Sequence, residues 1–253
     1  KLSSSLRADR VDYFTVIENK YRLLEQAFER FVNTDFEKND FLMFCEKNSF
    51  WLDAYAEFMI CKQRFNGQIW SDWPEDLREG RIDILTEFRA KFSADIKRIK
   101  FFQYIAFKQW SLLRVYCRQQ KIVLIGDIPI YVNEDSADVW ANPQIFKLGP
   151  KLKPVFVAGV PPDYFSKTGQ RWGNPVYDWD RLKSTGYEWW IKRVSYNLEL
   201  FDVIRIDHFR GLMGYWEIPA QEKTAINGHW AKGPGEDFLS HLRSVYPNLP
   251  IIA

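Results

Sequence analysis

The residues with the clearest chemical potential are Arg205, Asp207 and His208, which end a short apolar run at residues 203–206. The apolar members of this run are β-branched, which favours a buried strand. Alternate residues of a strand share a face, so Arg205 is expected to pair with Asp207. An arginine beside an aspartate keeps the carboxylate ionised, as a nucleophile requires.

Asp127 holds a similar position, because it follows a second apolar run at residues 122–125. Two carboxylates at strand ends suit glycosyl chemistry, in which one attacks the anomeric carbon and another donates and recovers a proton. Each aspartate is equally compatible with the N-cap of a following helix. The residues alone leave both interpretations open.

Other reaction classes find less support in the sequence. Gly126 stands alone, so no glycine-rich phosphate loop follows a strand, and no G-x-S-x-G nucleophile motif occurs. His208, His229 and His241 are too scattered for a typical zinc site. We therefore predict neither a metal nor a cofactor.

The composition limits the partners and the compartment. A net charge of +2, from 35 basic and 33 acidic residues, argues against nucleic acid or a membrane surface as partner. The 3 cysteines form no pair at close sequence spacing, which is typical of small buried thiols in a reducing compartment. We therefore predict a cytoplasmic protein. The 17% share of aromatic residues fits either a heavy core or flat platforms for sugar rings.

The predicted secondary structure that must position these residues differs between the first and second parts of the chain. Apolar residues recur at helical spacing from residue 10 to 65, with a break near 33–40, and again over 82–92. Residues 1–95 are therefore predicted to form a mainly helical subdomain or insertion.

From residue 96 the pattern is a helix followed by a buried strand, three times over. The expected helices are residues 96–119, 187–200 and 236–246, and the strands that follow them are 122–125, 203–206 and 251–252. Such an order predicts an α/β fold with a parallel sheet. The stretch 129–181 between the first two strands is rich in Pro, Gly, Asn and Asp, and is expected to be a long, irregular active-site loop region.

Several blocks of sequence carry a resemblance to a known family. The chain resembles the 4-α-glucanotransferases, also called amylomaltases or disproportionating enzymes, of glycoside hydrolase family 77. The matching blocks are Gly126–Val132, Asp135–Trp140, Ala158–Ser166, Thr168–Pro175, Arg205–Gly211 and Tyr215–Ala220. The resemblance implies that residues 96–253 are the central part of a (β/α)8 TIM barrel. It also implies transfer of an α-1,4-glucan segment, with retention of configuration, from one malto-oligosaccharide to the 4-hydroxyl of another.

The resemblance also implies roles for individual residues. Asp207 matches the nucleophile and Arg205 the arginine that orients it. The residues that the resemblance implies in substrate binding are Asp127, His208, Asp163, Tyr164, Phe165, Gln170 and Trp172. Trp172 either stacks on a glucose ring or pins its loop, and His208 either donates a hydrogen bond to the sugar or is structural.

One expected group is missing from the chain. The family's general acid/base is a glutamate that follows the strand ending here at Ala253, so the chain is expected to be an internal fragment with little activity alone. Glu217 is a poor substitute, because its Trp-Glu-Ile-Pro block is more typical of a wall of the site. The alternatives are an α-amylase-type hydrolase and a non-catalytic glucan-binding module. The sequence predicts no oligomeric state.

Overall fold

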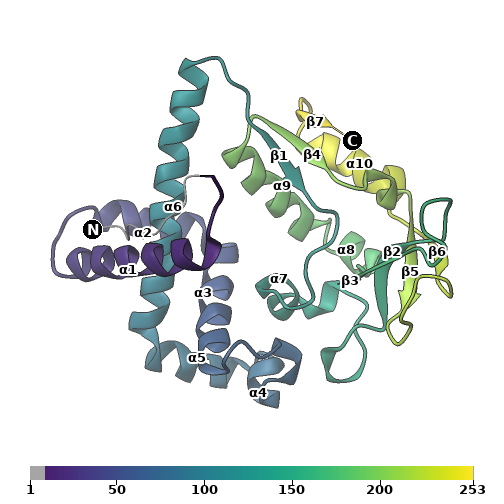
Figure 1. The fold of residues 1–253 in the computed structure, drawn as a ribbon, viewed down its shortest axis with the longest axis horizontal. Helices are drawn as coiled ribbons and strands as arrows, with labels where there is room; N and C mark the ends of the chain where they lie inside the picture. The colour runs from purple at the N-terminus through teal and green to yellow at the C-terminus, as the bar shows by residue number, and fades with distance from the viewer. Residues whose placement is uncertain (1–8, 253) are drawn as a thin grey trace.

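The computed structural model describes residues 9–252, and one long helix, α6 (Ser93–Gln119), organises the first part of the chain (Figure 1). The remaining helices of this part are α1 (Tyr13–Val32), α2 (Lys38–Lys47), α3 (Ser49–Arg64), the short 3-10 turn η1 (Trp70–Asp72), α4 (Glu75–Arg78) and α5 (Ile82–Lys91). Helices α1, α2, α3 and α5 all contact α6. The helices expected here are thus present, while the subdomain boundary at residue 95 stays a prediction.

Aromatic rings fill the space between these helices. Phe31 of α1 stacks on Phe101 of α6 with ring centroids 4.6 Å apart, and Phe41 of α2 meets Phe31 edge-on at 5.1 Å. Buried aromatic side chains contribute large apolar areas. Much of the aromatic surplus therefore belongs to the core.

No helix in residues 9–252 is long and apolar enough to cross a membrane.

The second expected helix is interrupted at Asn48, so the prediction of one continuous helix up to residue 65 is wrong. Asn48 is buried, and its side-chain amide donates to the carbonyl of Phe44 at 2.8 Å. The indole N–H of Trp51 donates to the Asn48 side-chain oxygen at 3.1 Å. An asparagine side chain that bonds neighbouring backbone groups competes with the helical ladder, which accounts for the break between α2 and α3.

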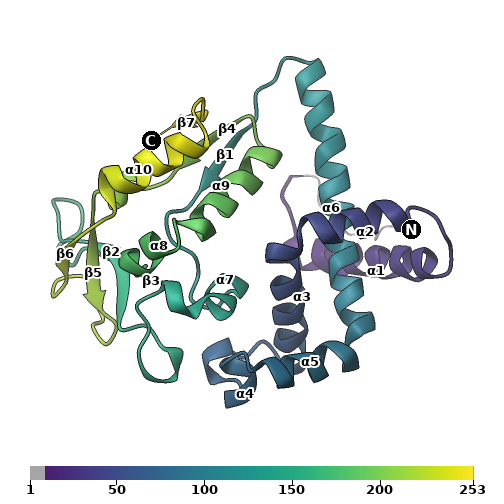
Figure 2. The same cartoon turned by 180° about the vertical axis from the view of Figure 1, so that it is seen from behind.

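The three helix-to-strand units form a parallel sheet, as predicted. Its strands are β1 (Ile125–Ile128), β4 (Val203–Ile206) and β7 (Ile251–Ile252), in the order β1-β4-β7. Helix α9 (Glu188–Leu200) leads into β4 and contacts both β1 and β4, and α10 (Gly235–Val245) leads into β7 (Figure 2). The α/β class is therefore present in the described chain.

The first strand is shifted from its expected position. It begins at Ile125 instead of Ile122, and Ile122 and Val123 are 50% and 61% exposed, so they are not a buried strand. The Leu124 carbonyl accepts from the backbone N–H groups of Asp202 and Val203, which ties the segment to the start of β4. Parallel pairing starts at the next residue. As a result, Asp127 lies within β1 and not beyond it, and it caps no described helix.

Residues 129–181 are more regular than expected, and the prediction of an irregular loop region is wrong. They contain β2 (Phe156–Val160), β3 (Gln170–Pro175), α7 (Ala137–Ala141), α8 (Trp179–Ser184) and the 3-10 turns η2 (Pro143–Ile145) and η3 (Pro150–Leu152). With β5 (Gly214–Pro219) and β6 (His229–Lys232), the strands form an antiparallel sheet in the order β3-β2-β5-β6. Half of this sheet comes from beyond residue 210, so local periodicity did not reveal it.

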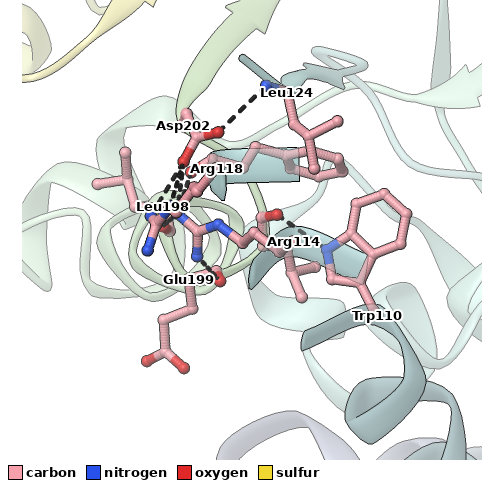
Figure 3. Close-up of polar contacts among 9 residues, drawn as sticks. Trp110, Arg114, Arg118, Leu124, Leu198, Glu199 and Asp202 are labelled. Carbon is pink, nitrogen blue, oxygen red and sulfur yellow. Dashed lines mark hydrogen bonds and ion pairs between the residues drawn. The ribbon is translucent and has the colours of Figure 1, made fainter. Parts of the chain in front are cut away.

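The start of the parallel sheet is held to α6 by the side chain of Arg114 (Figure 3). Its guanidinium donates to the backbone carbonyls of Glu199 and Phe201, at the C-terminal end of α9, and to the Asp202 carboxylate at 3.2 Å. Asp202 in turn accepts from the backbone N–H of Leu124 at 3.1 Å. The guanidinium thus bonds the end of α9 and Asp202, and Asp202 bonds Leu124, so Arg114 links α6 to the beginnings of β1 and β4.

Replacing Arg114 with Leu is expected to lower the free energy of unfolding by about 3 kcal/mol, because carbonyls and a carboxylate with little solvent access lose a charged donor. The side chains of Arg114 and Asp202 are only 15% and 19% exposed. Arg118→Leu is the matched control. Arg118 also bonds Asp202 but is 58% exposed, so a loss below about 1 kcal/mol is expected. Urea unfolding of both variants measures the difference, and equal losses would contradict this account.

Candidate active site

The guanidinium of Arg205 lies between the carboxylates of Asp127 and Asp207. One nitrogen, Nη1, is 2.8 and 2.9 Å from the two Asp127 oxygens, and Nη2 is 2.6 Å from Oδ1 of Asp207. The register of the parallel strands explains the arrangement, since Asp127 of β1 lies opposite Arg205 of β4 and Asp207 follows two residues later. The expected Arg205–Asp207 pair is present, and Asp127 joins it. We call these three residues the Asp-Arg-Asp cluster.

The cluster is accessible, although the sequence predicted a buried strand around Arg205. The side chains of Asp127, Arg205 and Asp207 are 59%, 44% and 53% exposed. The hydrogen bonds that Arg205 donates to Asp207 and then to Asp127 raise its pKa, so the guanidinium remains charged. Two carboxylates thus share one permanent cation on a surface that a ligand can reach.

His208 follows Asp207 and begins the turn η4 (Phe209–Leu212) in the left-handed backbone region, at φ 51°. Burial, followed by the nearby charge of Arg210, lowers the pKa of His208, and the opposing effect of Asp207 is smaller. The imidazole is therefore neutral at pH 7, with one nitrogen to donate and one to accept.

Trp172 of β3 meets the His208 ring edge-on, with centroids 5.0 Å apart. Its indole N–H donates to the side-chain oxygen of Gln170 at 3.0 Å, and its ring is also 6.5 Å from that of Tyr131. The structure thus brings Gln170, Trp172 and His208 together beside Asp207. Trp172 is held by these contacts and still 38% exposed, so both roles considered for it stay open.

The structure does not join Asp163, Tyr164 and Phe165 to this group by any hydrogen bond, ion pair or ring contact among the described residues. Tyr164 and Phe165 are 97% and 93% exposed and contact each other edge-on at 5.6 Å. The Asp163 carboxylate accepts from the backbone N–H groups of Phe165 and Ser166 at 2.9 and 2.7 Å. Asp163 therefore shapes the turn that presents the two rings to solvent.

Glu217 is buried and contacts Lys147 and His229, an arrangement that sequence reasoning missed. It is 4% exposed, and its two oxygens lie 2.7 Å from the Lys147 ammonium and 3.0 Å from Nε2 of His229. Burial opposes the charge on Lys147, but the bonds to Glu217 and Tyr215 outweigh it and raise the Lys147 pKa. Lys147 is distant in sequence from both partners, so no local signal marked it. This arrangement also supports the view that Glu217 is no substitute acid.

Tyr131 is a second residue that the sequence did not single out. Its ring stacks on Tyr177 at 5.7 Å and touches Trp172, and its buried hydroxyl has no hydrogen-bond partner within residues 9–252. Burial raises its pKa, so it remains a neutral phenol. Its position in the Gly126–Val132 block was the only available signal.

Gly159 allows β2 and β3 to approach closely, which positions Gln170 and Trp172. A Cβ at Gly159 would lie 2.2 Å from the backbone carbonyl oxygen of Gln170, whereas one at Gly214 in the same sheet meets only an ordinary contact of 3.5 Å. Gly159→Ala is therefore expected to lower the free energy of unfolding by about 1–3 kcal/mol through overpacking. Gly214→Ala is the control in a thermal melt. A smaller loss for Gly159→Ala than for the control would contradict the assigned role.

No group of three or more His, Cys, Asp or Glu within residues 9–252 is arranged to hold a metal ion. What the cluster offers is a carboxylate with an accessible oxygen beside a fixed cation, on the edge where parallel strands end. That chemistry suits attack on, and binding of, a neutral polyhydroxyl ligand.

A comparison with known protein families assigns the chain to one of them. The family model described as 4-alpha-glucanotransferase matches residues 1–253. The chain belongs to this family. It is 46% identical over 241 residues to the 4-alpha-glucanotransferase of Aquifex aeolicus, covering 95% of this chain and 49% of that protein. It is 39% identical to the 4-alpha-glucanotransferase, chloroplastic/amyloplastic, of Solanum tuberosum, covering 100% of this chain and 44% of that protein.

A solved structure agrees with this membership. The amylomaltase from Streptococcus agalactiae in complex with acarbose superposes with a TM-score of 0.91 at 37% identity, covering 96% of this chain and 49% of that one. The family predicted from the sequence is thus confirmed, and the fold is that of an amylomaltase over the region compared. The chain spans about half the length of the curated relatives that it matches.

Proposed function

We propose that this chain is the part of a longer 4-α-glucanotransferase that carries the nucleophile, and that β1, β4 and β7 are neighbouring strands of a (β/α)8 barrel. The observation that carries the proposal is the position of Arg205 between two accessible carboxylates on adjacent parallel strands. Family membership and the amylomaltase fold support it. The proposed substrates are malto-oligosaccharides and longer α-1,4-glucans.

In the proposed reaction, Asp207 attacks the anomeric carbon of the donor glucan. Arg205 bonds Oδ1 of Asp207, and no described residue bonds the second oxygen, which is therefore free to form the ester bond to C1. The bond from C1 to the departing 4-oxygen breaks, and that oxygen takes a proton from the family's glutamate. The acceptor's 4-hydroxyl then attacks C1, returns a proton to the glutamate and releases Asp207. Two inversions at C1 give net retention.

The neighbouring residues are assigned to binding of the sugar. Asp127, held by both of its oxygens to Arg205, is placed to accept from a sugar hydroxyl, and neutral His208 offers a donor beside the nucleophile. The exposed rings of Tyr164 and Phe165 would cover the acceptor, with Trp172 closer to the reacting glucose. Excluding water by such rings favours transfer over hydrolysis.

Incubation of the full-length protein with maltotriose tests the proposal. Transfer yields glucose together with chains longer than maltotriose. Accumulation of short products alone would instead support an α-amylase-type hydrolase, and no turnover would support a glucan-binding module.

The polypeptide of residues 1–253 is expected to give no measurable transfer by itself, because it lacks the proton donor that the resemblance implies. The comparison is a side-by-side assay with the full-length protein at equal concentration. Transfer at the full-length rate would contradict this expectation.

The cytoplasmic location remains a prediction from the cysteines, of which Cys61 and Cys117 are buried and Cys45 is partly so.

A further inference from the structure

Gly211, a buried residue of the turn η4, lies against the imidazole ring of His208. A Cβ at Gly211 would be 2.9 Å from Cδ2 and 3.5 Å from Nε2 of this ring, and 2.8 Å from Cδ1 of Ile130. Carbon atoms in contact are ordinarily about 3.5–4.0 Å apart. The ring therefore occupies space that is free only because residue 211 has no side chain.

The backbone of the turn has little room to shift. His208 lies in the left-handed region at φ 51°, and its carbonyl accepts from the backbone N–H of Gly211 at 2.8 Å. Gly233 packs closely against the turn, because a Cβ there would be 2.2 Å from the carbonyl oxygen of Leu212 and 2.9 Å from that of Gly211. A side chain at residue 211 would therefore have to displace other side chains and not the turn itself.

Of the two side chains that it would meet, His208 is the one that can move. Ile130 is 3% exposed within the hydrophobic core, and its carbonyl accepts from the buried hydroxyl of Tyr177 at 2.8 Å. His208 is half-buried, and its ring meets Trp172 edge-on at the accessible site. The imidazole can rotate toward solvent, whereas Ile130 has no such space.

Alanine at residue 211 is compatible with the fold. The backbone of Gly211 is not in the left-handed region, which an alanine would resist. The three atoms nearest to its Cβ all belong to side chains, whereas the nearest atom at Gly159 or Gly233 is a backbone carbonyl oxygen. Side chains can change rotamer without breaking the backbone hydrogen bonds. Gly211→Ala is therefore expected to fold with a displaced imidazole.

We infer that Gly211 is a positioning residue, which keeps the His208 imidazole beside Asp207 by leaving room for the ring. The role of His208 in sugar binding rests on the proposed function, whereas the dependence of its ring on Gly211 rests on the geometry of the turn. Groups that bind a ligand must be held to within about 0.5 Å of their productive position. A larger side chain at residue 211 would move the donor of His208 away from the sugar.

A double-mutant cycle in the full-length protein tests whether Gly211 acts through His208. Gly211→Ala is expected to lower kcat/KM for transfer from maltotriose by about tenfold. In a His208→Ala background the same substitution should change kcat/KM by less than about twofold, because the ring is already absent. Gly214→Ala is the matched control, since its Cβ would be 3.5 Å from the nearest atom, and it should have no effect beyond about twofold in either background. No loss in Gly211→Ala, or equal losses in both backgrounds, would overturn the inference.

NMR of the full-length protein with labelled histidine follows the ring directly, and His208→Ala identifies its signals. Burial is the largest cause that lowers the pKa of His208, the charge of Arg210 acts in the same direction, and that of Asp207 opposes both. A ring turned toward solvent loses the effect of burial, so its pKa should rise in Gly211→Ala and stay unchanged in Gly214→Ala. Unchanged His208 signals and pKa in Gly211→Ala would overturn the inference.

The NMR measurement needs no substrate, so it tests the geometry of the turn even if the maltotriose assay contradicts the proposed function. If Gly211→Ala is too unstable to study, both measurements are made in an Ile130→Val background. Valine lacks Cδ1 and so removes the contact with the core, while the contact with His208 remains. The same loss of kcat/KM and the same rise in the His208 pKa are then expected, and the absence of both would overturn the inference.

Discussion

Replacement of Asp207 by Asn in the full-length protein is expected to lower the rate of glucan transfer by on the order of 10⁴-fold, because the amide cannot form the glycosyl ester. Asparagine preserves the size of the side chain and can still accept from Arg205. The fold and glucan binding should therefore be retained. Initial rates of glucose release from maltotriose measure the effect.

Asp83→Asn is the matched control for this substitution. Asp83 also forms an exposed ion pair with an arginine, Arg81, at 2.7 Å, but it lies at the start of α5, outside the Asp-Arg-Asp cluster. Its replacement is expected to leave transfer within about twofold of the wild-type rate, since exposed ion pairs contribute little. Equal rates for wild type and Asp207→Asn would remove Asp207 from its assigned role.

Replacement of Arg205 by Ala is expected to reduce transfer by on the order of 10²- to 10³-fold, because it removes the cation shared by two carboxylates. Asp207 would also lose the donor that holds its Oδ1 in place. Initial rates of glucose release from maltotriose measure the loss.

Arg205→Lys separates charge from geometry at the same position. Lysine keeps the positive charge but cannot reach both carboxylates with a planar fork, as Arg205 does with Nη1 and Nη2. An intermediate rate is expected. A rate of transfer equal to wild type in Arg205→Ala would contradict the electrostatic role.

The sequence predicted the Arg205–Asp207 pair of the Asp-Arg-Asp cluster because its geometry follows from strand periodicity, but it did not predict that Arg205 also bonds Asp127. Alternation along β4 places Arg205 and Asp207 on one face, and parallel pairing of consecutive helix-to-strand units brings Asp127 beside them. It placed β1 imperfectly, because hydrophobicity begins at Ile122 whereas pairing begins at Ile125, after the Asp202 bonds to Leu124. Local composition cannot show which residue starts a ladder.

The antiparallel sheet was missed for a different reason. β3 is largely polar and has no apolar alternation, and β5, which pairs with β2, lies more than 50 residues beyond it, so no short window contains the whole signal. The same separation hid the Lys147–Glu217 ion pair and the contact of Trp172 with His208.

The most direct measurement of the central claim is mass spectrometry of the full-length protein after reaction with a maltosyl fluoride that carries a second fluorine on the reacting glucose. Fluoride leaves without a proton donor, and the ring fluorine slows breakdown of the ester, so the glycosyl-enzyme accumulates. The account predicts one added maltosyl unit on the peptide that contains Asp207, and none in Asp207→Asn. A label on any other carboxylate, or unchanged labelling in Asp207→Asn, would contradict it.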